Sequence, residues 1–486
     1  MIGDCDTLIR GALILDGTGA AGFPGDLAIL DGRIAAVGDC SGWEAEELLE
    51  GRGLALAPGF IDVHTHDDWA VLSDPGMACK ITQGVTTVIA GNCGLSAAPF
   101  LPHADLPAPF FVAGPASRQG FGSVTAYRQA LGSARPAVNL ALLVGHASLR
   151  SQVMGSDLAR PASPAETIAM QEALDLALRQ GAIGLSSGLD YPAAAEAPAE
   201  ELVALARVVA QHRGAVYTSH IRDEGDQVLE ALREALQTAG RAAAPLVISH
   251  HKCAGRANYG RSVETLAMIE AARAEQVVAL DAYPYVASST SLLPQFVEDS
   301  EAVKIIWSEP HPEMAGRWLE EIAAAWDLDQ REAVQRLSPA GAIYFDMDEG
   351  DLQRILAYGP TMIGSDGLPG TGRPHPRLWG AFPRVLSRYV REQRLLSLAQ
   401  AVHKMTGLSA RTFGLSDRGL LKAGLQADLV LFDPESVEDL ATFDKPEQVA
   451  RGIEAVFVRG QAALLQGGLS ASRHGRFLDR RDMAEG

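Results

Sequence analysis

The feature that most restricts the fold of this chain is a repeated alternation of short apolar runs with helical stretches, which continues from Ala57 to Asp417. Each run is rich in β-branched or apolar residues, ends in a polar turn, and leads into a stretch rich in Ala, Leu, Glu and Arg. Parallel strands joined by crossover helices have this order. The eight runs are residues 59–64, 86–90, 139–144, 181–186, 215–219, 245–249, 277–281 and 360–364. The pattern predicts a (β/α)8 TIM-type barrel, because eight parallel strands of this kind close on themselves.

Chemically reactive side chains follow these runs directly. They are His64, His66, Cys93, His146, Tyr191, His220, His250, Tyr283 and Asp366. In a barrel of this type the carboxyl ends of all the strands meet at one mouth, where catalytic groups collect. Reactive residues at random positions would rarely follow nearly every strand, so the sequence predicts one polar site at that mouth.

The two ends of the chain have a different pattern from the middle. Residues 8–16, 26–37, 427–433 and 455–458 are short apolar runs separated by Gly-rich turns, which indicates strands without intervening helices. A chain of 486 residues also exceeds what one hydrophobic core usually organises. We therefore expect residues 1–57 and 418–486 to form one small β-sandwich domain, and residues 58–417 to form a catalytic barrel.

One β/α unit of the predicted barrel is much longer than the others. Residues 287–342 follow the seventh run and include a helical stretch rich in Trp and Glu. Long connections in compact domains often cover an active site. We expect this insertion to form a lid over the mouth.

Charge and composition exclude several classes of partner. The 41 basic and 60 acidic residues give a net charge of −19, which repels nucleic acid and anionic lipid headgroups. Residues 1–10 lack the basic and apolar stretches of a secretion signal, and no apolar run approaches the about 20 residues of a membrane-spanning helix. We therefore expect a soluble, cytoplasmic protein with a small-molecule substrate. The sequence does not indicate an oligomeric state.

Imidazole and thiol groups predict a metal site at the mouth. His64 and His66 stand two residues apart at the end of the first run, so both rings can face the barrel axis. His220 and His250 follow the fifth and sixth runs, and Cys93 lies in a Gly-flanked turn after the second. Such a set favours zinc. Taken alone, the histidine pair would fit polar residues at a strand end, and the cysteine would fit a small buried hydrophobe.

Asp366 ends the last run, directly before Gly367. A carboxylate beside a cationic metal stays ionised and can accept a proton from water. Asp366 is therefore our candidate general base and general acid. The alternative is an aspartate that caps a turn or a helix.

Two cations and a hydroxyl surround the same opening. Lys252, Tyr283 and Arg377 follow the sixth, seventh and eighth runs and could together hold a carboxylate, although a surface ion pair is the usual role of a single Arg or Lys. Tyr191, after the fourth run, is a candidate donor to a developing oxyanion. Residues 286–295 contain no Lys or Arg and end in an apolar Leu-Leu-Pro stretch, which favours an apolar substrate side chain.

At this point the chain resembles the N-acyl-D-amino-acid deacylases (D-aminoacylases) of the amidohydrolase superfamily. The resemblance covers nearly the whole chain and is carried by the motifs at residues 57–66, 84–94, 219–224, 248–252, 281–285 and 364–367. It implies one tightly bound zinc ion at Cys93, His220 and His250, a weaker second site at His64 and His66, and Asp366 as the proton shuttle. It also implies hydrolysis of N-acyl-D-amino acids to a carboxylate and a free D-amino acid. The preference for D substrates comes from the resemblance alone.

Two other readings stay open. Hydantoinases and dihydroorotases usually carry a metal-bridging lysine at the end of the fourth strand, whereas residues 185–191 contain no lysine and Cys93 takes the bridging place. Another metal-dependent amide hydrolase, such as a hydantoinase or a dipeptidase, is the first alternative. A barrel that has lost its chemistry and only binds is the second, and an incomplete ligand set would indicate it.

Overall fold

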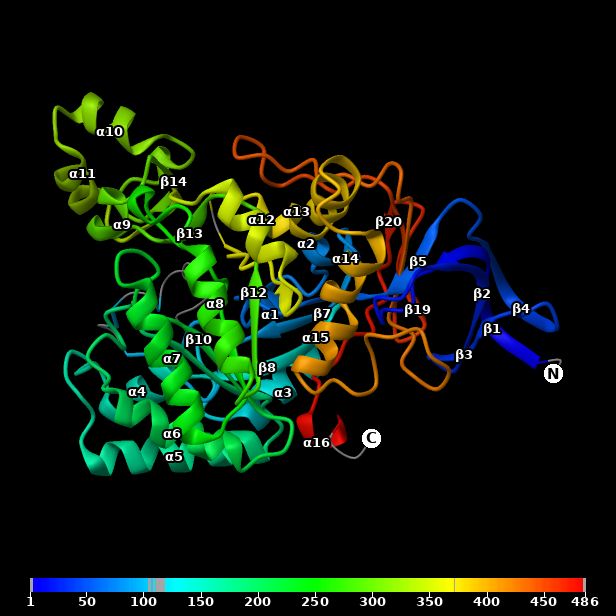
Figure 1. Ribbon diagram of the computed structural model, residues 1–486, viewed down its shortest axis with the longest axis horizontal. Helices are drawn as coiled ribbons and strands as arrows, with labels where there is room; N and C mark the ends of the chain where they lie inside the picture. Colours follow the sequence, from blue (N-terminus) through cyan, green and yellow to red (C-terminus); the bar gives the residue numbers. More distant parts are fainter. Residues whose placement is uncertain (1–2, 104–105, 108–109, 111–118, 371, 484–486) are drawn as a thin grey trace.

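The structure is a computed structural model that describes residues 3–103, 106, 107, 110, 119–370 and 372–483. Three sheets organise the described residues: an eight-stranded parallel sheet, a nine-stranded sheet, and a three-stranded antiparallel sheet (Figure 1). Figure 1 shows the nine-stranded sheet at one end of the molecule and the three-stranded sheet, with its helices, at the other. The parallel sheet lies between them.

The parallel sheet is the predicted barrel. Its strands are β6 (Phe60–Asp62), β7 (Val85–Ala90), β8 (Asn139–Gly145), β9 (Gly184–Gly188), β10 (Val216–His220), β11 (Leu246–Ile248), β12 (Val278–Ala282) and β16 (Thr361–Ile363). They pair in chain order from β6 to β16. An isolated parallel bridge between Thr65 and Gly367 joins the first and last strands just beyond their ends. The (β/α)8 fold is confirmed.

Helices cover the barrel, and amphipathic ones among them turn an apolar side toward the strands. In α7 (Val228–Ala242) the buried residues recur three or four positions apart and face the strands. The other helices of this layer are α3 (Val124–Ala134), α4 (His146–Met154), α5 (Pro164–Arg179), α6 (Ala199–Ala210), α8 (Ser262–Arg273), α12 (Glu349–Ala357), α13 (Arg377–Arg384), α14 (Leu398–Met405) and α15 (Gly407–Thr412). A π-helical segment, η4 (Val385–Glu392), continues α13, and the short helices α1 (Ala70–Ser73), α2 (Ala78–Ile81) and α16 (Arg480–Met483) fill gaps. None of the helices in the described part of the chain is long and apolar enough to span a membrane.

The fourth strand begins later than the sequence predicts. Residues 181–186 were expected to form it, but β9 begins at Gly184 because Gly181 has a φ of +108° and belongs to the turn that follows α5. Glycine is the residue that adopts this conformation without strain. The strand also ends two residues later than predicted, at Gly188, which brings its end closer to Tyr191.

The nine-stranded sheet is built from both ends of the chain, as expected. Its strands are β1 (Gly3–Ile14), β2 (Phe23–Leu30), β3 (Arg33–Gly38), β4 (Trp43–Glu50), β5 (Ala55–Pro58), β17 (Leu429–Phe432), β18 (Ile453–Val458), β19 (Gln461–Leu465) and β20 (Gly468–Leu469). β5 pairs with β1 on one side and with β17 on the other, which joins the two ends. The run predicted at residues 26–37 is a hairpin, because Asp31 and Gly32 both have positive φ and turn the chain between β2 and β3.

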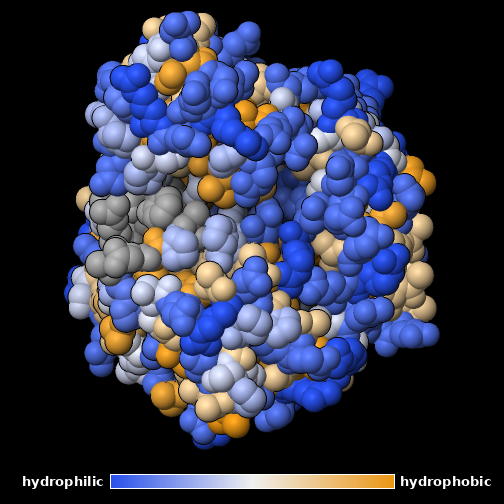
Figure 2. Space-filling view, turned by 90° about the vertical axis from the view of Figure 1, so that its left-hand side faces the viewer, coloured by the Kyte–Doolittle hydropathy of each residue, from blue (hydrophilic) through white to orange (hydrophobic). Residues whose placement is uncertain are grey.

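The insertion after β12 carries the three-stranded sheet. It contains β13 (Ser288–Ser291), α9 (Pro294–Glu298), β14 (Ala302–Ser308), α10 (Leu319–Trp326), α11 (Gln330–Leu337) and β15 (Ala340–Phe345), and it has a hydrophobic cluster of its own. Figure 2 shows a largely hydrophilic face with a hollow beneath the lobe at the top. Ser289 and Phe296 of this insertion line the cavity at the barrel mouth. Its role as a lid stays a prediction.

Candidate metal and active site

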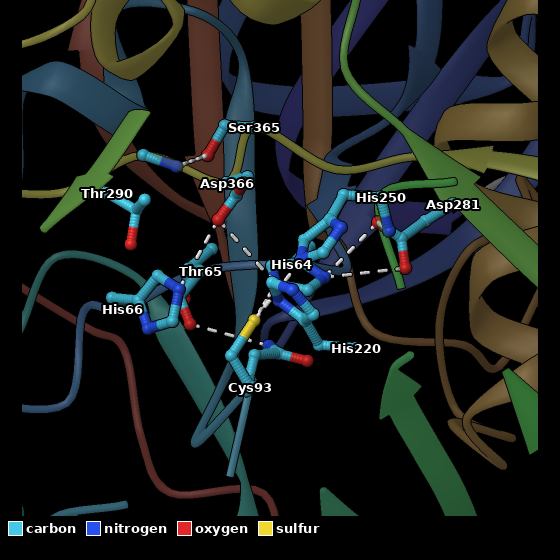
Figure 3. Close-up of polar contacts among 12 residues, drawn as sticks. His64, Thr65, His66, Cys93, His220, His250, Asp281, Thr290, Ser365 and Asp366 are labelled. Carbon is cyan, nitrogen blue, oxygen red and sulfur yellow. Dashed lines mark hydrogen bonds and ion pairs between the residues drawn. The ribbon is translucent and has the colours of Figure 1, made fainter. Parts of the chain in front are cut away.

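Four side chains from four barrel strands converge at the mouth. Ligand atoms of His64, Cys93, His250 and Asp366 all lie within 4.8 Å of one another. The Cys93 Sγ is 3.2 Å from His64 Nε2 and 3.3 Å from His250 Nε2, so the thiol lies between two imidazoles (Figure 3). Burial opposes ionisation of this thiol, but the charges of His64 and His250 and the hydrogen bond with His250 hold its pKa well below the usual value. The surroundings of Cys93 therefore favour the thiolate, which is the form that binds a metal.

The backbone at this site is held in an unusual conformation. Cys93, His250 and Asp366 all have positive φ, at 51°, 33° and 49°. Non-glycine residues in this region are strained, and such residues concentrate at functional sites. At Gly91 an added Cβ would lie 2.1 Å from the Leu143 carbonyl oxygen, so only glycine allows the turn that presents Cys93. The strained backbone lowers the stability of the fold, and it orients these three side chains toward the site.

His220 lies beside the cluster with its hydrogen-bonding capacity unused. Its ring centroid is 4.5 Å from that of His250, and the residue is only 5% exposed. Within the described part of the chain neither of its ring nitrogens has a hydrogen-bond partner. A buried imidazole without a partner is costly, and a metal ion would satisfy it. The combination of thiolate, imidazole and carboxylate ligands fits zinc.

Asp366 lies between the metal-binding cluster and a buried arginine. Its Oδ1 is 3.3 Å from His66 Nε2 and 3.6 Å from His64 Nε2, and its Oδ2 is 3.0 Å from Arg377 Nη2. Burial raises the pKa of this carboxyl group, but the Arg377 guanidinium and the neighbouring histidines lower it well below the usual value. Asp366 is therefore ionised and able to accept a proton.

The predicted carboxylate-binding residues also lie together. The Tyr283 ring is flanked by two cations, with Lys252 Nζ 5.7 Å and Arg377 Cζ 4.5 Å from its centroid. Lys252 Nζ donates to both oxygens of Glu224 at 2.6 Å. Arg377 is fully buried, and its Nε and Nη1 have no partner among the described residues. Tyr191 packs beside His220, with ring centroids 5.0 Å apart.

The comparisons with known proteins identify the family. A model described as "Amidohydrolase family" matches residues 49–463. A D-aminoacylase of Alcaligenes xylosoxydans xylosoxydans is 48% identical over 475 residues, which cover 98% of this chain and 98% of that protein. This chain belongs to the N-acyl-D-amino-acid deacylase family of amidohydrolases. An N-acyl-D-glutamate deacylase of the same organism is also 48% identical, over 98% of this chain and 96% of that protein.

Solved structures of the deacylase family agree with this membership. A D-aminoacylase structure, from work on the binuclear metal center of that enzyme, is 49% identical over 98% of this chain and 100% of that one, with a TM-score of 0.94. An N-acyl-D-glutamate deacylase from Bordetella bronchiseptica, complexed with zinc and a phosphonate inhibitor, is 47% identical over the same shares, with a TM-score of 0.93. An L-hydantoinase from Arthrobacter aurescens is 17% identical over 98% of this chain and 100% of that one, with a TM-score of 0.60, and shares the fold alone.

One residue from the list of reactive side chains lies outside this deacylase-family site. His146 begins α4, and its Nε2 is 2.8 Å from Glu201 Oε1. Arg150 donates to both oxygens of the same carboxylate. This buried network joins α4 to α6. His146, although it follows β8, therefore stabilises the packing of these helices.

Sequence reasoning missed two carboxylates that orient the histidines. Asp281 lies 3.2 Å from His64 Nδ1 and accepts a hydrogen bond from the His250 backbone N–H at 2.9 Å. Glu224 Oε1 lies 3.0 Å from His250 Nδ1, which leaves Nε2 of that ring directed at Cys93. Carboxylates commonly fix metal-binding histidines in this way. Asp281 is the last residue of the seventh run that the sequence predicts, and Glu224 follows His220 by four residues, so the positions of both residues offered a signal.

A buried lysine supports the site from behind and was also missed. Lys80 Nζ lies 2.8 Å from Asp62, 3.2 Å from Asp67 and 3.0 Å from Ser365 Oγ. Asp62 in turn accepts a hydrogen bond from the Ser365 backbone N–H at 2.7 Å, directly before Asp366. Burial lowers the pKa of Lys80, but Asp62 and Asp67 outweigh it, so the lysine is charged. The sequence gives no sign of this group, because α2 is far from Asp366 along the chain.

Proposed function

We propose that this chain hydrolyses N-acyl-D-amino acids to a carboxylate and a free D-amino acid, with zinc as its metal. The observation that carries the proposal is the cluster of Cys93, His64, His250 and Asp366 beside the buried cations Lys252 and Arg377. The cluster of potential metal ligands suits activation of an amide, and the two cations suit binding of the α-carboxylate of an acylated amino acid.

The metal would be held by Cys93, His220 and His250, with His64 and His66 at a second, weaker position. Zinc at such a site supplies Lewis acidity, which polarises a carbonyl and makes a bound water more acidic. The unpartnered nitrogens of His220 and the thiolate of Cys93 support this assignment. Asp281 and Glu224 would hold His64 and His250 in the required orientation.

Asp366 is the proposed proton carrier. Hydrolysis moves one proton from water to the amine nitrogen that leaves, and an ionised carboxylate beside both is suited to accept it and return it. Arg377 holds Asp366 Oδ2 at 3.0 Å, so Oδ1 stays directed at the cluster. The low pKa of Asp366 supports a base that is ready at neutral pH.

Substrate orientation is assigned to Lys252, Tyr283 and Arg377. Two N–H groups of Arg377, at Nε and Nη1, have no partner among the described residues and can each donate to a carboxylate, and Lys252 adds a second positive charge beside the Tyr283 ring. Holding the α-carboxylate fixes which way the acyl carbonyl points. We further propose that Tyr191, whose hydroxyl is 3.0 Å from Thr290 Oγ1, donates to the developing oxyanion.

The handedness rests on the relatives, which are named for D substrates. Identity does not decide the side chain, because the D-aminoacylase and the N-acyl-D-glutamate deacylase are equally similar to this chain. Phe296, Leu95 and Leu368 line the cavity and support the apolar contact that the sequence predicts. The free state of all five cysteines supports a reducing compartment such as the cytoplasm.

The test is release of free amino acid from N-acetyl-D-leucine, N-acetyl-L-leucine and N-acetyl-D-lysine by the zinc-loaded protein, with and without a chelator. We expect release from D compounds only, abolished by the chelator and restored by zinc. Release from the L compound at an equal rate would remove the D assignment. Hydrolysis of hydantoins but of no linear amide would replace the proposal with a cyclic amidase.

A further inference from the structure

The cavity at the barrel mouth extends away from the metal cluster toward the insertion. It has a volume of about 220 Å³. Its inner end is lined by Cys93, His220 and His250, and its outer wall by residues of the insertion, among them Ser289 and Phe296. A substrate whose amide lies at the cluster would direct its side chain along this outer wall.

Carboxylates dominate the outer part of the cavity. Asp223, Asp226, Asp299 and Asp346 all line it. Among the described lining residues Lys252 is the single lysine or arginine, and its ammonium is already held by both oxygens of Glu224 at 2.6 Å. The nearby Arg377 pairs with Asp366. Among the described residues none of the four aspartates has an ion pair within 4.0 Å, and the charge of Lys252, which acts on Asp346 from farther away, is shared with Glu224.

Asp346 is the buried member of this group. It follows β15 directly and is only 8% exposed. Its Oδ2 accepts a hydrogen bond from Ser288 Oγ at 2.8 Å, whereas its Oδ1 is buried and has no partner among the described residues. Burial raises the pKa of this carboxyl group to about 6. A buried carboxylate without a partner destabilises the fold unless a ligand donates a hydrogen bond or brings a positive charge to it.

Ser289 and Asp299, which also line the cavity, make this part of it more polar and more negatively charged. The Ser289 hydroxyl is also buried without a partner in the described residues. Burial and the charges of Asp226 and Asp223 raise the pKa of Asp299. These carboxylates repel one another across the cavity, and a positive charge placed among them would relieve that repulsion.

We propose that this part of the cavity is a subsite for a cationic side chain, and that the preferred substrates are N-acyl derivatives of D-lysine- or D-arginine-like amino acids. The carboxylate of Asp346 receives the charged end, while Phe296 and Leu368 contact the aliphatic stem. This inference rests on the proposed deacylase function and names its substrate class. An acidic side chain would meet Asp346 and Asp299, so N-acyl-D-glutamate is excluded.

The experiment compares N-acetyl-D-lysine with N-acetyl-D-norleucine, which has the same stem without the ammonium group. We expect the wild-type kcat/KM for the lysine compound to exceed that for the norleucine compound by about tenfold or more. In Asp346→Asn, which keeps the shape of the side chain, this advantage should fall to about twofold while turnover of the norleucine compound changes little. Asp299→Asn, at an exposed position, should reduce the advantage by about threefold.

A binding measurement separates this inference from the proposed function. Calorimetric titration of the two free products, D-lysine and D-norleucine, should show tighter binding of D-lysine to wild-type protein and equal binding to Asp346→Asn. A preference for norleucine, or an equal loss for both substrates in Asp346→Asn, would overturn the cationic subsite while leaving the deacylase intact. Tighter binding of D-lysine without hydrolysis of any acetyl amino acid would keep the subsite and remove the deacylase.

Discussion

The floor and the outer wall of the cavity are built on different principles. The floor is formed by residues at the ends of barrel strands, and its carboxylates have cationic partners, as in Asp366 with Arg377 and Asp62 with Lys80. The wall comes largely from the insertion and leaves a buried carboxylate oxygen of Asp346 unpartnered. A paired floor suits chemistry common to all substrates, and an unpaired wall suits selection among them. Variants of the two regions should therefore differ in whether their effect depends on the substrate side chain.

The largest effect on the floor is expected for Asp366→Asn. Loss of the proton carrier should reduce kcat by about a thousandfold or more for every substrate, because general acid and base catalysis contributes about 10²–10⁴-fold. Zinc content, measured by metal analysis, should stay near that of the wild type, since the thiolate and the histidines remain. Near-normal turnover in this variant would remove Asp366 from the mechanism.

The second prediction concerns the support beneath the floor. Lys80→Met leaves Asp62 and Asp67 buried without their cation, and breaking a buried pair in this way costs about 3–5 kcal/mol in the free energy of unfolding. Denaturant unfolding of the two proteins measures this loss. The triple variant Lys80→Met, Asp62→Asn, Asp67→Asn removes the uncompensated charges and should regain part of it. Equal stability of wild type and Lys80→Met would show that the network behind Asp366 is not structural.

These two residues also show what sequence can and cannot provide. Asp366 was predicted because strand ends are marked by apolar runs, and barrel geometry brings all strand ends together. Lys80 was not, because its partners are set by how α2 packs against β6 and the loop after β16, which no local pattern encodes. The same holds for Asp346, which follows a strand of the insertion sheet and not of the barrel. The roles assigned to the ligand residues stay predictions until the variants are measured.

The third prediction concerns the pH dependence of zinc binding at the floor. Burial lowers the pKa values of His66 and His220, but neighbouring anions outweigh it and raise them to about 9 and about 10, whereas the pKa of Cys93 is held well below its usual value. At neutral pH the metal-free protein therefore holds protons on these imidazoles that zinc must displace. Zinc affinity should rise about tenfold per pH unit for each proton displaced between pH 6 and 8. Competition titrations with a chelator of known affinity, corrected for its own protonation, would detect this slope.

The smallest expected effect belongs to the wall. Phe296 is half-buried on α9, and its ring lies 5.6 Å from that of Tyr344, so truncation removes apolar surface from the cavity without touching the floor. Phe296→Ala should raise KM for N-acetyl-D-norleucine by about threefold, because only part of a side chain's contact area is lost. N-acetyl-D-alanine, whose methyl group is too short to reach α9, should be unaffected. Phe23→Ala, at an exposed position in the small sheet, is the control and should change neither KM. If Phe296→Ala raised KM equally for both substrates, the insertion would act on the whole active site, and the division between a catalytic floor and a selective wall would fail.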